Sequence, residues 1–152
     1  MITLKFGGTS MESARRILGS ADIIVGRAKT DRLSVVVSAV AGVSNGLQES
    51  IDACVSGQNP DKFVQNLRNV HSEICAELQS KLPGFDSSAV MKKLEPLFVE
   101  YEKLLTGCVS FGECPNTIHC RIMGMGELLS SPIMEAVLLA KKQSVILLDS
   151  RK

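Results

Sequence analysis

Tryptophan is absent from this 152-residue sequence, and aromatic residues make up only 4% of it. Proteins that bind single-stranded nucleic acid stack its bases on aromatic side chains, so this composition argues against such a role. An excess of charge is missing as well, because 17 basic and 16 acidic residues leave a formal net charge of +1. We therefore expect no nucleic-acid partner and no attraction to an anionic membrane.

Long apolar runs are also missing, since none approaches the roughly 20 residues that span a bilayer. The chain enters its first apolar segment at once, without the basic and apolar regions of a signal peptide. These two features predict a cytoplasmic protein without a membrane partner.

Paired cysteine motifs are lacking. The five cysteines are an odd number and show no CxxC spacing: Cys54, Cys75, Cys108, Cys114 and Cys120. A disulfide framework is therefore disfavoured. Cys114, His119 and Cys120 are residue types that ligate zinc, but no second pair completes four ligands. We favour free thiols over a metal site.

The residues that are present fit one soluble α/β domain, with 45% hydrophobic and 22% charged residues. Apolar runs predict strands, of which the second and third are expected to be buried on both faces. Helical periodicity predicts the segments between them, with a kink or break at Pro96. The expected strands are residues 2–6, 33–38 and 145–149, and the expected helices are residues 14–28, 47–55, 61–82, 87–105 and 127–140. Residues 107–126 are expected to be irregular, and His71 is expected at a helix surface or cap.

The first strand leads into Gly7 and Gly8. Paired glycines permit positive φ and close approach, so their N–H groups can converge on a phosphate. Lys5 precedes them, which excludes a Walker A loop but would place its ammonium on nucleotide phosphoryl oxygens. Thr9 and Glu12 have the spacing of a capping box. The alternative is a solvated strand-end lysine before an ordinary tight turn.

The second strand leads into another loop of small residues, 39–46. In parallel sheets the loops at the carboxyl ends of strands form the ligand site, so this loop is expected beside the first one. The hydroxyls of Ser38 and Ser44, with Asn45, could then meet a polar substrate. From spacing alone the simpler interpretation is favoured, namely that Gly42 and Gly46 only turn the chain.

Taken together, three segments resemble the aspartokinase family. They are KFGGTS at residues 5–10, SAVAGVSN at residues 38–45 and GELLSS at residues 126–131. The resemblance covers nearly the whole chain. It implies the amino-acid kinase fold, a three-layer α/β/α domain with a mainly parallel sheet. It also implies an enzyme that phosphorylates the side-chain carboxylate of L-aspartate with ATP, on the route to lysine, threonine and methionine.

The resemblance assigns roles residue by residue. It makes Lys5 the catalytic lysine that contacts phosphate, with Gly7 and Gly8 as the backbone cradle and Thr9 and Ser10 beside them. It assigns the substrate site to Ser38, Ala39, Ser44, which matches a residue that is usually threonine, and Glu127, which would meet the α-ammonium of aspartate.

A second Gly-Glu pair competes for the acidic role. Glu113 is followed by Cys-Pro-Asn, which is typical of a turn, whereas Glu127 opens a helical segment. We therefore choose Glu127.

The resemblance further implies that residues 1–152 are the N-terminal portion of a kinase domain, with the ligands for Mg²⁺ and the adenine-binding loops lying outside it. A homo-oligomer is expected. Two alternatives stay open. One is another acceptor, such as glutamate, acetylglutamate, carbamate or a nucleotide, and the other is a non-catalytic half-domain that binds an amino acid or a partner chain.

Overall fold

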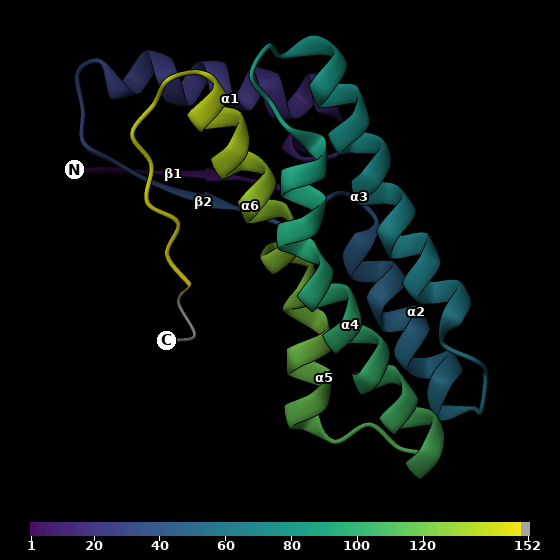
Figure 1. Cartoon of the computed structure of the whole chain (residues 1–152). Helices are drawn as coiled ribbons and strands as arrows, with labels where there is room; N and C mark the ends of the chain where they lie inside the picture. The colour runs from purple at the N-terminus through teal and green to yellow at the C-terminus, as the bar shows by residue number, and fades with distance from the viewer. Residues whose placement is uncertain (150–152) are drawn as a thin grey trace.

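Two short parallel strands lie at one side of a helical assembly (Figure 1). The computed structural model describes residues 1–149. Strand β1 (Ile2–Phe6) pairs in parallel with β2 (Leu33–Val37), in a register that sets Ile2 opposite Leu33 and Phe6 opposite Val37. The connection between them is the helix α1, as a parallel pair requires. Both strands therefore end at the same edge, and the two predicted loops begin there.

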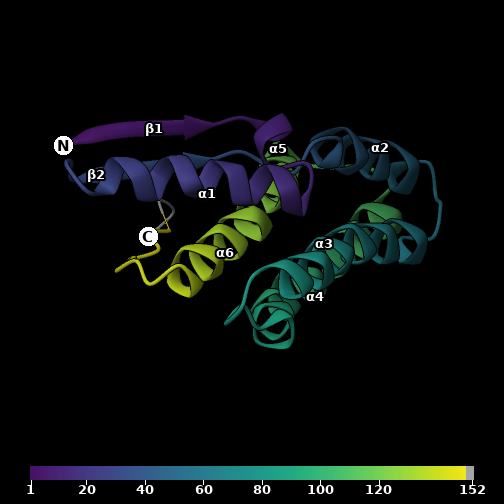
Figure 2. The same ribbon diagram turned by 90° about the horizontal axis from the view of Figure 1, so that it is seen from above.

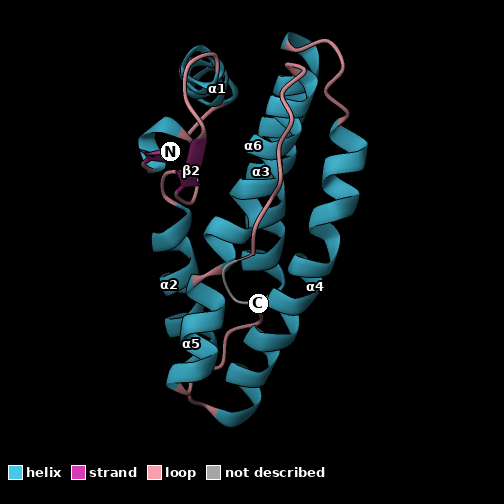
Figure 3. Cartoon of the chain, turned by 90° about the vertical axis from the view of Figure 1, so that its left-hand side faces the viewer, coloured by secondary structure: helices cyan, strands magenta, loops and turns pink. Residues whose placement is uncertain are grey.

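The rest of the described chain is mainly helical. Seen from above, α6 runs between α1 with its strands and the antiparallel pair α3 and α4 (Figure 2). A view from the side shows how little of the molecule is strand (Figure 3). The helices are α1 (Ala14–Ala28), α2 (Val43–Val55), α3 (Asp61–Lys81), α4 (Ser87–Phe111), α5 (Asn116–Met123) and α6 (Met125–Ala140), with a 3₁₀ helix, η1 (Gly8–Ser10), after β1.

The core lies between the helices. Its largest fully buried side chains come from most of the elements and include Met11, Ile17, Leu47, Leu78, Leu94, Phe98, Tyr101, Leu105, Ile122, Leu129 and Ile133. The buried Tyr101 hydroxyl donates to Ser50 Oγ at 2.7 Å, and Ser50 Oγ donates to the carbonyl of Leu47 at 2.6 Å. This chain of hydrogen bonds ties α4 to α2 and leaves neither hydroxyl unsatisfied.

The predicted third strand is wrong. Residues 143–149, the last that the structure describes, form no strand, and Ile146 and Leu148 are each 82% exposed. A strand needs a neighbour for its N–H and C=O groups, and apolar composition alone does not provide one.

The prediction that the second strand is buried on both faces is also wrong, because Val36 is 46% exposed on the sheet face opposite Phe6 and Val37. Within residues 1–149 the fold is helix-rich with a two-stranded parallel sheet, which is compatible with a three-layer domain but does not display one.

Two helix boundaries also differ from expectation. Helix α2 begins at Val43 and not at residue 47, because Gly42 takes a left-handed conformation (φ 82°) and the chain enters the helix directly after it. Helix α4 continues through Pro96 as far as Phe111. Pro96 is exposed, while Leu94 and Phe98 on either side of it are fully buried. Core packing on both sides therefore holds the helix together across the proline. The segment expected to be irregular contains the end of α4 and the whole of α5.

His71 is buried and not at the surface, with 0% of it exposed. Its Nδ1–H donates to the carbonyl of Leu67 at 2.8 Å, and its ring meets Phe98 edge-on with centroids 6.1 Å apart. Its Nε2 is buried and has no hydrogen-bond partner among residues 1–149. The polar neighbours of His71 in sequence point outward, while this residue shares the inner face of α3 with Leu67, Ile74 and Leu78.

One stretch, Asn116–Ala140, is long and apolar enough to meet a length-and-hydropathy test for a membrane span, with a mean hydropathy of 1.4. However, 56% of the 18-residue window that meets the test is buried inside the fold. Core helices of globular proteins meet the same test, and α6 is such a helix, so the stretch is explained by core packing.

Candidate functional site

Lys5 extends from β1 on the side of the sheet opposite the core. Its neighbour Phe6 is buried, and side chains alternate along a strand, so Lys5 is exposed beside Val36 of β2. Within residues 1–149 its ammonium forms no hydrogen bond or ion pair with another side chain. The cation at the end of β1 is therefore available to an external anion.

The glycine turn has a different geometry from the one expected. Gly7 has φ −77° and ψ 175°, and Gly8 begins the 3₁₀ helix η1, so neither glycine uses positive φ. Close approach is what requires Gly8, because a Cβ there would lie 3.2 Å from the carbonyl oxygen of Ala39. Ser10 N–H is occupied, since it donates to the carbonyl of Gly7 at 2.9 Å. The glycines thus bring the first turn against the loop that follows β2.

The predicted capping box is also wrong. Thr9 lies exposed in η1, and the N-cap of α1 is Ser13, whose Oγ accepts from Arg16 N–H at 3.4 Å. Glu12 is exposed and makes no hydrogen bond to Thr9 within the described residues. The 3₁₀ turn delays the start of the helix by one turn and leaves the Thr9 hydroxyl at the surface.

The loop after β2 is where the predicted motifs meet. Ser38 N–H donates to the carbonyl of Phe6 at 2.9 Å, which extends the pairing of the strands by one residue. Ala39 is buried, with Gly8 on one side of it. Ser44 is exposed on the first turn of α2. The chain thus turns from a buried strand end to an exposed hydroxyl within six residues.

Helix α6 packs onto this loop through its first turn. A Cβ on Gly126 would lie 2.5 Å from the Cβ of Ala39, so only glycine lets the helix come so close. Next in sequence, Glu127 is exposed, and its Oε1 accepts from Ala39 N–H at 3.4 Å. Its position in the first turn of α6 also suits a carboxylate, because of the helix dipole.

Ser130 is a residue of this junction that sequence reasoning missed as a site residue. It is fully buried, and its Oγ donates to the carbonyl of Ser38 at 2.9 Å. The available signal was its spacing, since Ser130 follows Glu127 by three residues and so shares its side of α6. By contrast, Glu113 is exposed between α4 and α5, with no partner among the described residues.

Residues 38–39, which begin the second predicted motif, therefore contact the other two. Gly8 comes from the first, and Gly126, Glu127 and Ser130 come from the third. Lys5, Thr9 and Ser44 are exposed, and no hydrogen bond joins them to Glu127 within residues 1–149. The described residues thus offer a cation near the end of β1, and a carboxylate and hydroxyls at the loop after β2. This is a set of groups that can hold and orient a charged substrate.

His119, one of the residues considered as a zinc ligand, instead takes part in hydrogen bonds between helices. His119 Nε2 lies 2.9 Å from Gln48 Oε1, and Gln48 Nε2 donates to Asp52 Oδ1 at 2.9 Å. This series of hydrogen bonds links α5 to α2. Within the described residues no group of three His, Cys, Asp or Glu side chains is placed to hold a metal ion. The five cysteines are free thiols, and burial raises the pKa of Cys75 to about 11.

Comparison with known proteins finds sequences and structures that are similar to this chain. No family model matches the chain. It is 28% identical over all of its 152 residues to a bifunctional aspartokinase/homoserine dehydrogenase of Buchnera aphidicola subsp. Acyrthosiphon pisum, of which it covers 19%. It is 28% identical to an aspartokinase of Chlamydia pneumoniae, with 99% of the chain aligned to 30% of that protein. The chain thus spans 19% to 30% of the length of these relatives.

Solved structures show a similarity to the same kind of enzyme. The fold matches aspartokinase III of E. coli in complex with lysine and aspartate, with a TM-score of 0.76 and 24% identity over 95% of this chain and 30% of that one. The same enzyme in complex with aspartate and ADP gives a TM-score of 0.75 and 25% identity, over 93% of this chain and 29% of that one. The resemblance to aspartokinases is therefore confirmed across the chain, which has the fold of part of an aspartokinase.

Proposed function

We propose that this chain is the N-terminal portion of the kinase domain of an aspartokinase, an enzyme that transfers the γ-phosphoryl group of ATP to the side-chain carboxylate of L-aspartate. The observation that carries the proposal is the contact of the Gly8 and Glu127 segments with Ala39. It brings three motifs, distant in sequence, to one edge of the sheet. The proposal also draws on relatives that are aspartokinases over the whole length of this chain.

The phosphate end of the site is residues 5–10. Lys5 supplies a positive charge for the transferring phosphoryl group. The backbone of Gly7 and Gly8 can approach phosphate closely because no side chain intervenes. Their hydroxyl-bearing neighbours Thr9 and Ser10 lie alongside, although the N–H of Ser10 is already bonded to Gly7. The Ser10 N–H is therefore not available to phosphate.

The acceptor end is formed by Ser38, Ala39, Ser44 and Glu127. The Ala39 N–H holds one oxygen of the Glu127 carboxylate, which fixes the side chain and leaves the other oxygen for the α-ammonium of aspartate. Ser44 presents a hydroxyl on the exposed first turn of α2. A fixed anion for a non-reacting ammonium orients the substrate without taking part in bond making.

This division of roles suits phosphoryl transfer, in which the protein mainly positions the reactants and neutralises charge. Mg²⁺ would supply part of that neutralisation when bound. In keeping with the resemblance, we assign its ligands to residues outside this chain. Adenine-binding residues are assigned there as well. In keeping with the sequence expectations, we place the enzyme in the cytoplasm, as a homo-oligomer in lysine, threonine and methionine synthesis.

The test is a product assay on the longer protein that contains this chain. Aspartyl phosphate is trapped with hydroxylamine, and ADP is measured in parallel, with aspartate, glutamate, acetylglutamate, carbamate and a nucleoside monophosphate as acceptors. Aspartate alone should give both the hydroxamate and stoichiometric ADP. Turnover with another acceptor and none with aspartate would refute the aspartate assignment, and no turnover with any acceptor would refute the kinase assignment.

A further inference from the structure

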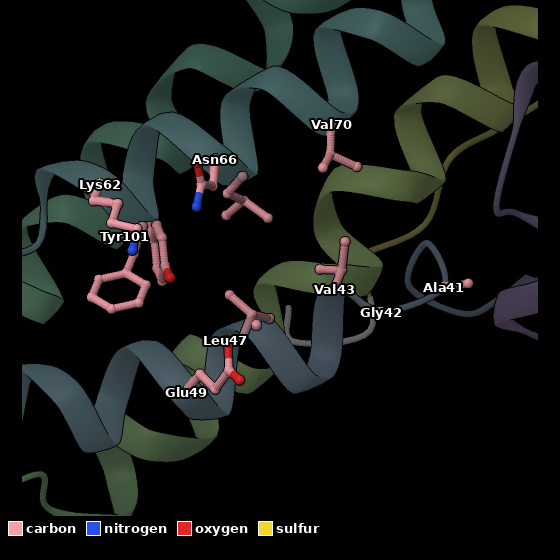
Figure 4. Close-up of a pocket in the computed structure, with 12 residues that line it drawn as sticks. Ala41, Gly42, Val43, Leu47, Glu49, Lys62, Asn66, Val70 and Tyr101 are labelled. Carbon is pink, nitrogen blue, oxygen red and sulfur yellow. The ribbon is translucent and has the colours of Figure 1, made fainter.

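A groove opens between α2 and α3 (Figure 4). Its volume is about 370 Å³, at the small end of the range of ligand pockets. Residues 41–49 form one side and residues 62–70 form the other, with Tyr101 of α4 at one end. It adjoins the proposed substrate site, because Ala41, Gly42 and Val43 line it, but neither Ser44 nor Glu127 does.

The floor of the groove is apolar. Leu47 and Tyr101 are each 1% exposed, and Leu67 is 7% exposed, so their packing against the core fixes the shape of the floor. Val70, on the wall that α3 forms, is 37% exposed, and Figure 4 shows it at the same end of the groove as Val43. Apolar surface of this kind gains free energy when a hydrocarbon side chain covers it.

The mouth of the groove carries charge of both signs. Lys62 and Asn66 lie one turn apart on α3, so their side chains share one face of the helix. Glu49 lies across from them on α2 (Figure 4). All three are exposed, and none makes a side-chain hydrogen bond or ion pair within residues 1–149.

Some charged side chains on α3 have partners and others do not. Arg68 pairs with Glu95, and Lys81 pairs with Glu77 at 2.8 Å, whereas exposed Asp61 and Glu73 form no ion pair within residues 1–149. What distinguishes Lys62 and Glu49 is their position, because these two opposite and unpaired charges flank an apolar hollow. A ligand with both charges and an apolar body matches this pattern at three points.

We propose that the α2–α3 groove binds a small zwitterion with an aliphatic side chain, that is, an α-amino acid of the size of leucine. Its carboxylate contacts Lys62 and Asn66, its ammonium contacts Glu49, and its side chain covers the exposed surface of Val70. The groove has room for it because Gly46, on α2, carries no side chain. This site does not depend on the proposed kinase activity.

The test is an amide-resolved NMR titration of the 152-residue chain with L-leucine. Saturable shifts should centre on residues 41–49 and 62–70. Three probes each lack one feature of the ligand: 4-methylpentanoate has no ammonium, isoamylamine has no carboxylate, and glycine has no hydrocarbon side chain. Each should bind at least about tenfold more weakly than leucine, a loss of the size that one charge-assisted hydrogen bond or a buried side chain accounts for.

Three variants locate the contacts. A Cβ at Gly46 would meet nothing within 4 Å, so Gly46→Met fills the groove without strain and should abolish leucine binding. Gly26→Met, at an equally open position in α1, should leave it unchanged. Lys62→Gln should weaken leucine and 4-methylpentanoate but not isoamylamine, and Glu49→Gln should weaken leucine and isoamylamine but not 4-methylpentanoate.

The proposal is overturned if leucine produces no saturable shifts, or if Gly46→Met binds it as the unaltered chain does. Equal affinity for leucine and 4-methylpentanoate would also overturn it, since the ammonium would then contribute nothing. Circular dichroism of each variant separates lost binding from lost folding. Kinase assays are not involved, so failure here and failure of the proposed function can be told apart.

Discussion

The side-chain carboxylate of Glu127 accepts a hydrogen bond from the backbone N–H of Ala39, at 3.4 Å and across 88 positions of sequence. The contact joins the first turn of α6 to the loop after β2. It exists because Gly126 removes the Cβ that would otherwise collide with Ala39. One glycine therefore decides whether the acidic residue reaches the loop, and this dependence gives the first prediction.

Gly126→Ala should destabilise the fold by about 1–3 kcal/mol, the usual cost of overpacking a filled site. The added Cβ would lie 2.5 Å from the Cβ of Ala39, so α6 or the loop must move. Urea unfolding followed by circular dichroism measures the change. Gly107→Ala in α4 is the control, because a Cβ there meets nothing within 4 Å and should stabilise the chain slightly. Equal stability of the two variants would contradict the close contact.

Glu127→Gln should raise the KM for aspartate in the longer enzyme and leave kcat less affected. The amide oxygen can still accept from Ala39 N–H, so the geometry is retained while the charge that faces the α-ammonium is lost. Such uniform binding appears in KM and not in kcat. Steady-state kinetics measures both constants. Glu113→Gln is the matched control, since it alters the competing Gly-Glu pair and should change neither constant. A rise in the KM for ATP would refute the assignment of Glu127.

Lys5→Ala should lower kcat by about 1,000-fold or more, because the lost charge acts on the transferring phosphoryl group. Stability should barely change, since Lys5 is exposed and forms no ion pair within the described residues. Single-turnover kinetics and thermal unfolding of the longer enzyme measure the two effects, with Lys29→Ala as the control for an exposed lysine. A stable Lys5→Ala enzyme with near-normal turnover would remove Lys5 from the catalytic site.

His71 should make the fold less stable as the pH falls below about 6.5, where an unfolded histidine binds its proton. Burial lowers the pKa of His71 in the folded chain, and the hydrogen bond to Leu67 only partly opposes this shift. Between the two pKa values the unfolded state holds more protons, so the stability present above pH 6.5 is lost as the pH falls through the folded pKa. Urea unfolding of the chain and of His71→Leu, compared from pH 7.5 to 5, measures this contribution. If the free energy of unfolding falls equally with pH in the unaltered chain and in His71→Leu, then His71 does not contribute to the pH dependence.

The local sequence was sufficient where one residue pattern decides the structure. Strands β1 and β2 follow from apolar runs, and the helix α1 and most of α3 follow from helical periodicity. The motifs around Lys5 and Glu127 pointed to the right family of relatives. The sequence also predicted that the loops after β1 and β2 would lie together, since parallel strands end at one edge.

Other features depend on contacts that no local pattern contains. Residues 145–149 have the composition of a strand but no neighbouring strand within the described chain. His71 is buried because Phe98 of α4 packs against it. The roles of Gly126 and Ser130 arise from a helix that packs on Ala39, far away in sequence. Each of these errors concerns tertiary packing and not the identity of the motifs.

The last prediction concerns the 152-residue chain by itself, which should show no aspartate-dependent consumption of ATP and at most weak binding of either substrate. The chain supplies Lys5, the glycine turn and Glu127, whereas the resemblance assigns the ligands of Mg²⁺ to residues outside it. Without the metal, one exposed lysine must offset the charge of a triphosphate in water, where a single ion pair contributes little. Calorimetric titration with ATP, Mg²⁺ and aspartate measures the binding, and a coupled ADP assay measures turnover. The longer protein that contains this chain serves as the positive control. Micromolar affinity for ATP in the chain alone would show that residues 5–10 form a complete phosphate site and that the assignment of essential ligands to other residues is wrong.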